Sequence, residues 1–293
     1  MKDLKGIYTA HLTPFTGEGK IKKDVLAQLI RHNLALGADG FYVCGSTAEA
    51  LMLTAQERME IMEVVKEAAP HAKLIAHVGS INQRDAIRLA KYAKELSYDL
   101  ISSVAPYYYK FSFSEIKEYY IRLAEESGMR MLVYHIPVFS GVGMGMNELS
   151  SFLGDDRFAG IKYTSNDFFT MERCKALYPD KLILNGYDEM LLSGLAMGAD
   201  GGIGSTYNFM ADKFVRIRKL FAEGKMEEAR AVQNEANRII SVLCSVGVMQ
   251  GEKEIMNQLG LDFGNCLPPF SGLSEEQKSL IAKEIMPYIQ PLA

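Results

Sequence analysis

Eight short apolar runs, separated by longer segments with helical patterning, constrain the fold of this chain more than any other feature. Each run is short enough to be a strand buried on both faces. The segments between them, such as 23–36 and 114–127, carry their charges on one face, which is typical of helices that cover a sheet. Eight strand–helix units in series predict a parallel sheet closed into a (β/α)8 TIM barrel. The runs span residues 7–12, 40–44, 73–78, 100–104, 130–134, 158–162, 181–185 and 201–203.

The chain has 293 residues, which is more than the roughly 250 that such a barrel typically takes. No strand-like run follows the eighth one. Instead, residues 223–243, 248–259 and 274–291 have helical patterning. We therefore predict that residues 1–222 form the barrel and that residues 223–293 form a C-terminal helical extension.

Composition and charge exclude several classes of protein. The hydrophobic share of 48% supplies a sizeable core and excludes wholesale disorder. With a net charge of −4 and no run of basic residues, we expect no nucleic-acid or membrane surface. The four cysteines are widely spaced and the histidines lack metal-ligand spacing, so we expect reduced thiols and no bound metal. The N-terminus carries no export signal, which indicates a cytoplasmic protein.

Lys162 is the most informative single residue of the predicted barrel. Catalytic residues of such barrels lie at the C-terminal ends of the strands, and Lys162 ends the sixth run. Burial lowers the pKa of a lysine. A neutral amine is the form that attacks a keto group to give a Schiff base. The competing interpretation is a lysine at the barrel rim in an ordinary ion pair.

Tyr134 ends the predicted strand next to that of Lys162, which makes it a candidate for passing a proton at the reacting centre. A phenol does this when a nearby cation lowers its pKa from the ordinary value of about 10. The competing interpretation is an aromatic side chain that only fills the barrel.

The second run leads into a tight loop formed by Gly45, Ser46 and Thr47. Its backbone N–H groups and two hydroxyls suit a substrate carboxylate, because a carboxylate needs several donors that converge on its oxygens. The competing interpretation is a turn that caps a helix.

Taken together, these residues resemble the pyruvate-dependent class I aldolases of the N-acetylneuraminate lyase and dihydrodipicolinate synthase family. The resemblance covers nearly the whole chain from Gly6 onward. It implies a (β/α)8 barrel and a Schiff-base mechanism that needs no external cofactor. The stretches that carry it are YVCGSTAEA (42–50), PYYYKFSF (106–113), VYHIPVFSGV (133–142), GIKYTS (160–165) and NGYDEMLLSGLAMGADGGIGSTYN (185–208).

The resemblance also implies a role for each matching residue. Lys162 matches the lysine that forms the Schiff base, and Tyr134 matches the tyrosine that shuttles the proton. Ser46 and Thr47 match the residues that bind the pyruvate carboxylate and complete a hydroxyl relay. Tyr108 matches a tyrosine that reaches into a neighbouring subunit's site. The positions that match those holding the sugar portion of the substrate are Thr164, Gly186, Asp188, Glu189, Gly204 and Ser205.

Asp188 and Glu189 follow the seventh run and offer hydrogen-bond acceptors to a polyhydroxylated chain. Without the resemblance, acids that favour a helix N-terminus explain them equally well. The region Val138, Phe139 and Ser140 lacks the arginine with which synthases of the family bind a second carboxylate. An unpaired carboxylate is poorly tolerated, so a neutral, hydroxyl-rich aldehyde is favoured.

The implied activity is the reversible cleavage of N-acetylneuraminate to pyruvate and N-acetylmannosamine, by a homotetramer with a Schiff base through Lys162. A lyase for another 2-keto-3-deoxy sugar acid is the first alternative. A non-catalytic sugar-acid binding protein is the second.

Two positions depart from the family's pattern. Ala48 stands where glycine is usual, and a Cβ there is strained if the position needs a positive φ. His135 stands where asparagine is more frequent, which either tunes proton transfer by Tyr134 or replaces a hydrogen bond.

Overall fold

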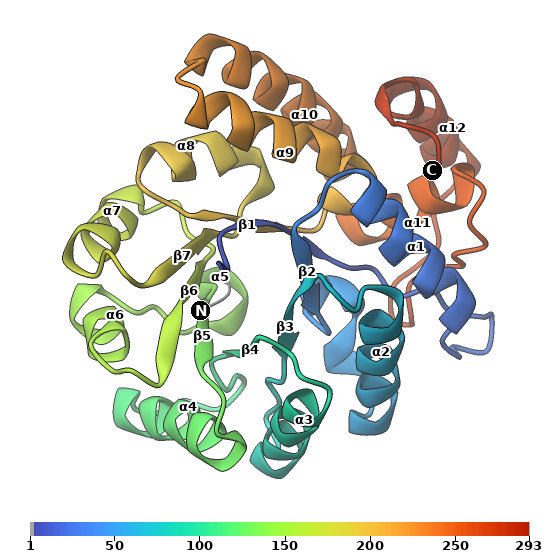
Figure 1. Ribbon diagram of the computed structural model, residues 1–293. Helices are drawn as coiled ribbons and strands as arrows, with labels where there is room; N and C mark the ends of the chain where they lie inside the picture. Colours follow the sequence, from blue (N-terminus) through green and yellow to red (C-terminus); the bar gives the residue numbers. More distant parts are fainter. Residues whose placement is uncertain (1–2, 293) are drawn as a thin grey trace.

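The computed structural model describes residues 3–292 of the chain. Its eight strands are all parallel and pair in chain order, and the eighth pairs with the first to close the ring. Helices surround these strands on the outside (Figure 1). The predicted (β/α)8 barrel with C-terminal helices is therefore confirmed. The strands are β1 (Gly6–Ala10), β2 (Gly40–Val43), β3 (Lys73–His77), β4 (Leu100–Val104), β5 (Met131–His135), β6 (Phe158–Tyr163), β7 (Leu182–Asn185) and β8 (Gly201–Gly204).

The helices that follow the strands bury apolar side chains in the core, as their patterning predicts. They are α1 (Lys23–Ala35), α2 (Ala55–Ala68), α3 (Gln83–Glu95), α4 (Phe113–Ser127), α5 (Pro137–Ser140), α6 (Met146–Leu153), α7 (Phe168–Leu177), α8 (Leu191–Ala196) and α9 (Tyr207–Ala222). The C-terminal helices are α10 (Met226–Val246), α11 (Val248–Gln258) and α12 (Glu275–Glu284). Short 3₁₀ turns are η1 (Ser46–Ala48), η2 (Ala50–Met52), η3 (Asp188–Met190) and η4 (Met286–Tyr288).

The predicted element boundaries lie within a few residues of those in the structure, with one larger difference. The helix expected over 274–291 ends at Glu284, and Pro287 lies in the separate turn η4. Proline lacks the N–H that an α-helix needs and clashes with the preceding turn, so a continuous helix through this position is disfavoured. The division of the chain into two parts at residue 222 stays a prediction.

A bulge in β6 decides the direction in which Lys162 points. The pairing of β5 with β6 passes from Phe158 directly to Gly160, so that Ala159 is skipped. Ala159 faces the barrel interior, whereas Ile161 packs under the helices. Side chains alternate along a regular strand, and the extra residue shifts this alternation by one. As a result Lys162 points inward, toward the aromatic rings of the interior.

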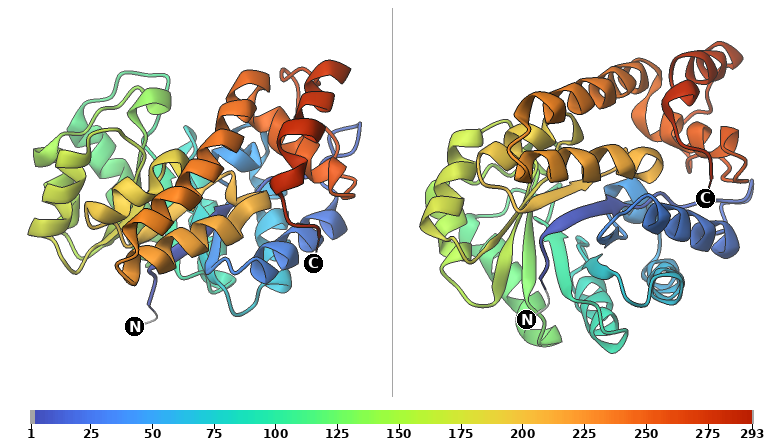
Figure 2. Two further views of the ribbon diagram at one scale, coloured as in Figure 1. Left: turned by 90° about the horizontal axis from the view of Figure 1, so that it is seen from above. Right: turned by 45° about the horizontal axis from the view of Figure 1, so that its top comes forward.

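The C-terminal helices lie together on one side of the barrel, beside α9 and α1 (Figures 1 and 2). Apolar side chains of α9, α10, α11 and α12 form one cluster with Leu29 of α1. A buried ion pair adds a polar link, since Lys253 Nζ lies 2.5 Å from Glu49 Oε1. Glu49 also accepts a hydrogen bond of 2.6 Å from the Leu267 N–H. These contacts tie the C-terminal helices to the loop that follows β2.

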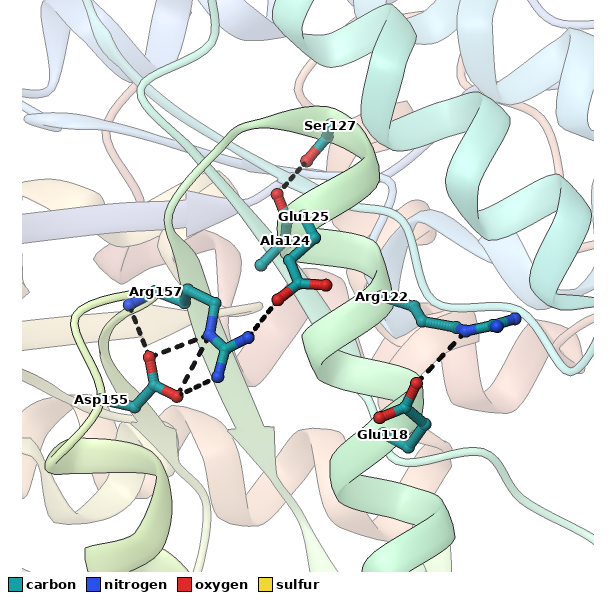
Figure 3. A network of polar contacts seen from close by, with 7 residues as sticks. All are labelled: Glu118, Arg122, Ala124, Glu125, Ser127, Asp155 and Arg157. Carbon is teal, nitrogen blue, oxygen red and sulfur yellow. Dashed lines mark hydrogen bonds and ion pairs between the residues drawn. The ribbon is translucent and has the colours of Figure 1, made fainter.

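A surface network stabilises the opposite end of the barrel, where β6 begins (Figure 3). Arg157 precedes this strand and pairs with Asp155 through Nη2 at 2.6 Å. It also contacts Glu125 of α4, while Arg122 and Glu118 pair further along the same helix. Exposed pairs of this kind contribute modestly to stability. Arg157 and Asp155 lie just before the N-terminal end of β6, which fits a structural role.

Candidate active site

Lys162 projects from β6 into an aromatic environment inside the barrel. Its side chain is only 5% exposed, and Nζ lies 4.0 Å from the ring centroid of Tyr134 and 4.3 Å from that of Tyr42. Burial lowers the pKa of Lys162 to about 7, and the charge of Asp188 opposes this shift. Within residues 3–292, no ion pair includes Lys162, so the structure does not support the rim ion pair. A large share of the amine is neutral near pH 7.

Tyr134 is the direct register partner of Lys162 on the neighbouring strand. Burial raises the pKa of the Tyr134 hydroxyl, and the nearby hydroxyls of Ser46 and Thr164 oppose that rise. The expectation that a cation lowers this pKa is wrong for the free site. The Lys162 amine lies over the face of the ring, and burial has the larger effect. Tyr134 therefore keeps its proton and is suited to a relay between hydroxyls.

Two buried histidines fix the backbone at the end of β2. His11 Nε2 accepts a hydrogen bond of 3.2 Å from the Cys44 N–H, and His77 Nδ1 lies 3.0 Å from the Cys44 carbonyl oxygen, to which it donates. The other ring nitrogen of His77 accepts from the Val104 N–H at 3.2 Å. Burial lowers the pKa of His11 to about 4 and that of His77 well below its usual range, so both are neutral. Cys44 is thereby held at a φ of 60°, which sets the direction of the following loop.

Ser46 and Thr47 lie in the turn η1, just after Cys44. No side chain caps the turn, so the structure does not support the capping interpretation. Ser46 is exposed and Thr47 half-buried, which leaves their hydroxyls accessible. Ala48 is buried within the turn and is not among the residues with positive φ; Glu49, which follows it, has a φ of 56°. The strain considered at Ala48 is therefore absent, and the left-handed residue is the next one in the chain.

Asp188 is buried at the mouth of the barrel, in the segment after β7, and Lys162 lies on the neighbouring strand β6. Its Oδ2 accepts hydrogen bonds of 2.8 Å from the Thr206 N–H and 2.7 Å from the Thr206 hydroxyl. A Cβ on Gly204 would lie 2.2 Å from Oδ1, so glycine is needed there to admit the carboxylate. Burial raises the pKa of Asp188 to about 7, and the charge of Lys162 opposes the rise. Asp188 thus joins the β7 and β8 loops, while Glu189 beside it is half-buried.

Thr164 and Gly186 meet at the same mouth. A Cβ on Gly186 would lie 1.8 Å from Thr164 Oγ1, so the glycine makes room for that hydroxyl. Thr164 Oγ1 is buried and makes no hydrogen bond of good geometry to a described residue, although it lies near enough to the Tyr134 hydroxyl to act on its pKa. Ser205, which follows β8, is half-buried. These positions bring hydroxyls from two loops to one end of the site.

Two residues singled out from the sequence lie elsewhere. Tyr108 is 87% exposed with a φ of 76°, so within one chain it does not join the site. His135 faces outward and packs against the Tyr163 ring, with centroids 5.1 Å apart, while Tyr134 faces inward. Its Nδ1 has no hydrogen-bond partner among the described residues. The structure therefore supports neither role considered for His135, direct tuning of Tyr134 or a replaced hydrogen bond.

Neither a metal centre nor a membrane helix is found in the part of the chain that the structure describes. Over residues 3–292, His, Cys, Asp and Glu side chains do not gather in groups of three that would hold a metal ion. No described helix is long and apolar enough to cross a membrane.

Comparison with known proteins identifies the family. The sequence model of the dihydrodipicolinate synthetase family matches residues 3–287, which is nearly the entire chain. The chain belongs to the dihydrodipicolinate synthetase family. The family predicted from the sequence is thereby confirmed. Aldolases of this family are class I enzymes that work through a lysine Schiff base, and Lys162 is the penultimate residue of β6, near the strand end where such a lysine is expected.

Relatives within the dihydrodipicolinate synthetase family match this chain over nearly its whole length. The N-acetylneuraminate lyase of Actinobacillus pleuropneumoniae is 42% identical, with 97% of this chain and 98% of the relative covered. The structure of CdNal from Clostridium difficile in complex with mannosamine superimposes with a TM-score of 0.95 at 38% identity, covering 98% and 100%. The N-acetylneuraminate lyase of Fusobacterium nucleatum complexed with pyruvate gives 0.91 at 38%, covering 96% and 97%.

Sequence reasoning missed the groups that hold the site in place. His11 and His77 were considered only as metal ligands, because the hydrogen bonds of a buried neutral histidine leave no spacing signal. Arg58 donates to the His77 carbonyl oxygen at 2.6 Å and is buried on α2, where a sequence pattern suggests a solvated charge. Glu252 on α11 was also missed. It occupies the apolar stripe that includes Val248 and Ile255, and an acid in such a stripe is a usable signal.

The lowered pKa of Lys162 makes a prediction about its reactivity. Reductive alkylation with a small neutral aldehyde should speed up about tenfold per pH unit below pH 7, because the neutral fraction does so, and should level off above about pH 8. Peptide-resolved mass spectrometry measures the rate at Lys162. The exposed lysines of the same sample are the control, since ordinary amines gain reactivity up to about pH 10. A Lys162 rate that follows theirs would contradict the buried neutral amine.

Proposed function

We propose that this protein is a Schiff-base lyase that cleaves N-acetylneuraminate reversibly to pyruvate and N-acetylmannosamine. The observation that carries the proposal is the inward-facing amine of Lys162, 5% exposed, with a pKa lowered to about 7. The relatives named N-acetylneuraminate lyase, 42% identical over 287 residues, support this substrate. The activity belongs to the degradation of sialic acids.

In the proposed reaction the neutral Lys162 amine attacks C2 of the open-chain keto acid, and loss of water gives a protonated imine. Removal of the C4 hydroxyl proton breaks the C3–C4 bond. The bonding electrons pass into the imine and form an enamine, and the aldehyde leaves. Protonation of the enamine at C3 and addition of water then release pyruvate and the free lysine. Lysine serves as the electron sink, so the proposal needs no other cofactor.

The proton route in this proposal runs through Tyr134. Burial raises the pKa of its hydroxyl, so the phenol stays protonated and cannot act as a base on its own. The hydroxyls near it, on Ser46 and Thr164, allow a proton to be handed on while another is taken up. Once the imine has formed, its positive charge favours loss of a proton from the neighbouring hydroxyl groups. Ser46 and Thr47 are proposed to hold the pyruvate carboxylate.

The sugar portion of the substrate is proposed to lie at the mouth formed by the β6, β7 and β8 loops. Asp188 is fixed there by two hydrogen bonds from Thr206. Glu189 and Ser205 lie half-buried beside it and offer further polar groups. Acceptors of this kind suit a hydroxylated chain. Gly186 and Gly204 contribute space rather than contacts in this proposal.

We also propose a cytoplasmic homotetramer in which Tyr108 reaches the site of a neighbouring subunit. A positive φ is rare for an aromatic residue, and Tyr108 combines it with an 87% exposed side chain. Tyr109 and Phe139 are exposed apolar residues as well, and surfaces of this kind mark interfaces. The four free cysteines fit a reducing compartment.

The proposed activity is tested by pyruvate release across a panel of keto sugar acids. We expect kcat/KM for N-acetylneuraminate to exceed that for 2-keto-3-deoxygluconate by about 100-fold or more. The variant Lys162→Met is the control and should release no pyruvate from either. The reverse preference would favour a lyase for another sugar acid. Calorimetric binding without pyruvate release would favour the non-catalytic binding protein.

The role of Tyr108 is tested by mixing two inactive variants. Tyr108→Ala keeps Lys162 but lacks the tyrosine, and Lys162→Met supplies the tyrosine to its neighbour. Hybrid tetramers assembled from both should therefore regain activity above either parent. Mixed tetramers without recovered activity, or a fully active monomer in sedimentation, would contradict the role.

A further inference from the structure

Glu252 is an acidic residue on α11 with no exposed surface. Neither of its carboxyl oxygens makes a hydrogen bond of good geometry to a described residue, although the Ser205 hydroxyl lies near enough to act on its pKa. An unsatisfied polar group in the interior lowers stability, and buried polar groups are rarely left so. A buried polar group of this kind calls for an explanation, and a role at a functional site is one.

The surroundings of Glu252 connect it to the sugar end of the proposed site. The Ser205 hydroxyl favours its ionised form, while the Asp188 carboxylate opposes it. The Cys266 thiol is also near, since burial raises its pKa and the charge of Glu252 adds a smaller part of that rise. Lys253 follows in the chain but is engaged with Glu49 at 2.5 Å. The charged group that acts on Glu252 is thus the Asp188 carboxylate. Burial raises the pKa of Glu252 to about 8.

We propose that Glu252 is a positioning residue for the sugar end of the site, acting through the Ser205 hydroxyl to select the aldehyde portion of the substrate. This inference rests on the proposed function, because Ser205 binds the aldehyde portion only in a lyase of this kind.

The proposed contact determines which way the Ser205 hydroxyl faces. A protonated Glu252 carries one O–H donor, and the Ser205 hydroxyl is the polar group that acts on it. When Oγ accepts that hydrogen bond, the Ser205 hydroxyl is free to donate to an oxygen of the sugar. Asp188, which has no proton to give when ionised, accepts from a sugar hydroxyl instead. Donor and acceptor then alternate along the sugar end, which matches a chain of hydroxyls.

Three variants separate this role from a structural one. Glu252→Leu removes the donor and fills the space with an apolar side chain. Glu252→Gln keeps a donor without the ionisable group. Glu254→Leu is the matched control, since Glu254 is half-buried on the same helix and accepts from Gln258 at 2.8 Å, away from the site.

The experiment measures condensation of pyruvate with N-acetylmannosamine and with mannose. Glu252→Leu should raise the KM for both aldehydes about tenfold, as expected for one lost hydrogen bond. The KM for pyruvate and the borohydride trapping of pyruvate should stay unchanged. Glu252→Gln should recover most of the lost aldehyde affinity, and Glu254→Leu should behave as the wild type. The melting temperature of Glu252→Leu should not fall, because removing a buried carboxyl offsets the loss of one hydrogen bond.

Other outcomes overturn the proposal in distinguishable ways. An unchanged aldehyde KM in Glu252→Leu, an equal rise in the pyruvate KM, or a lower melting temperature would each contradict the positioning role while the proposed function stands. A wild-type protein that traps pyruvate but condenses it with no aldehyde would contradict the proposed function and this inference together.

Discussion

The candidate site depends on the burial of one amine, that of Lys162. Lys162 ends up inside a closed barrel, 5% exposed, between the rings of Tyr42 and Tyr134. A charged ammonium is unfavourable there, and no described residue forms an ion pair with it. Burial therefore lowers the pKa of Lys162 to about 7. The charge of Asp188 opposes part of that fall. Both charge states of the lysine are therefore accessible near neutral pH, which a cycle of imine formation and release requires.

Several otherwise unrelated features act on Lys162 and on the loop after β2. The bulge at Ala159 turns Lys162 inward, and Gly160 permits it because a Cβ there would lie 1.8 Å from the Leu182 carbonyl oxygen. His11 and His77 hold the end of β2, from which the Ser46 loop departs. The C-terminal helices complete the support through the buried pair of Lys253 and Glu49. The helices beyond the barrel are thus linked to the loop proposed to bind pyruvate.

The sequence was sufficient for the barrel because its strands are short, buried on both faces and regularly spaced. It was also sufficient for the position of Lys162 at a strand end, which the barrel makes meaningful. It did not predict the bulge, since β6 is buried on both faces and an extra residue leaves no break in its buried run. It placed Tyr134 correctly but misjudged its ionisation, because burial depends on neighbours from other strands. His77 and Glu252 act through contacts between residues distant in the chain, which no local pattern encodes.

The central claim is that Lys162 is the residue that carries the substrate. Incubation of the protein with pyruvate and borohydride, followed by digestion and mass spectrometry of every lysine-containing peptide, tests it most directly. The reduced pyruvate adduct should be found on Lys162 alone, in nearly every subunit, and be absent from the variant Lys162→Met. An unmodified Lys162 under these conditions, or an adduct on another lysine that survives in Lys162→Met, would contradict the mechanism.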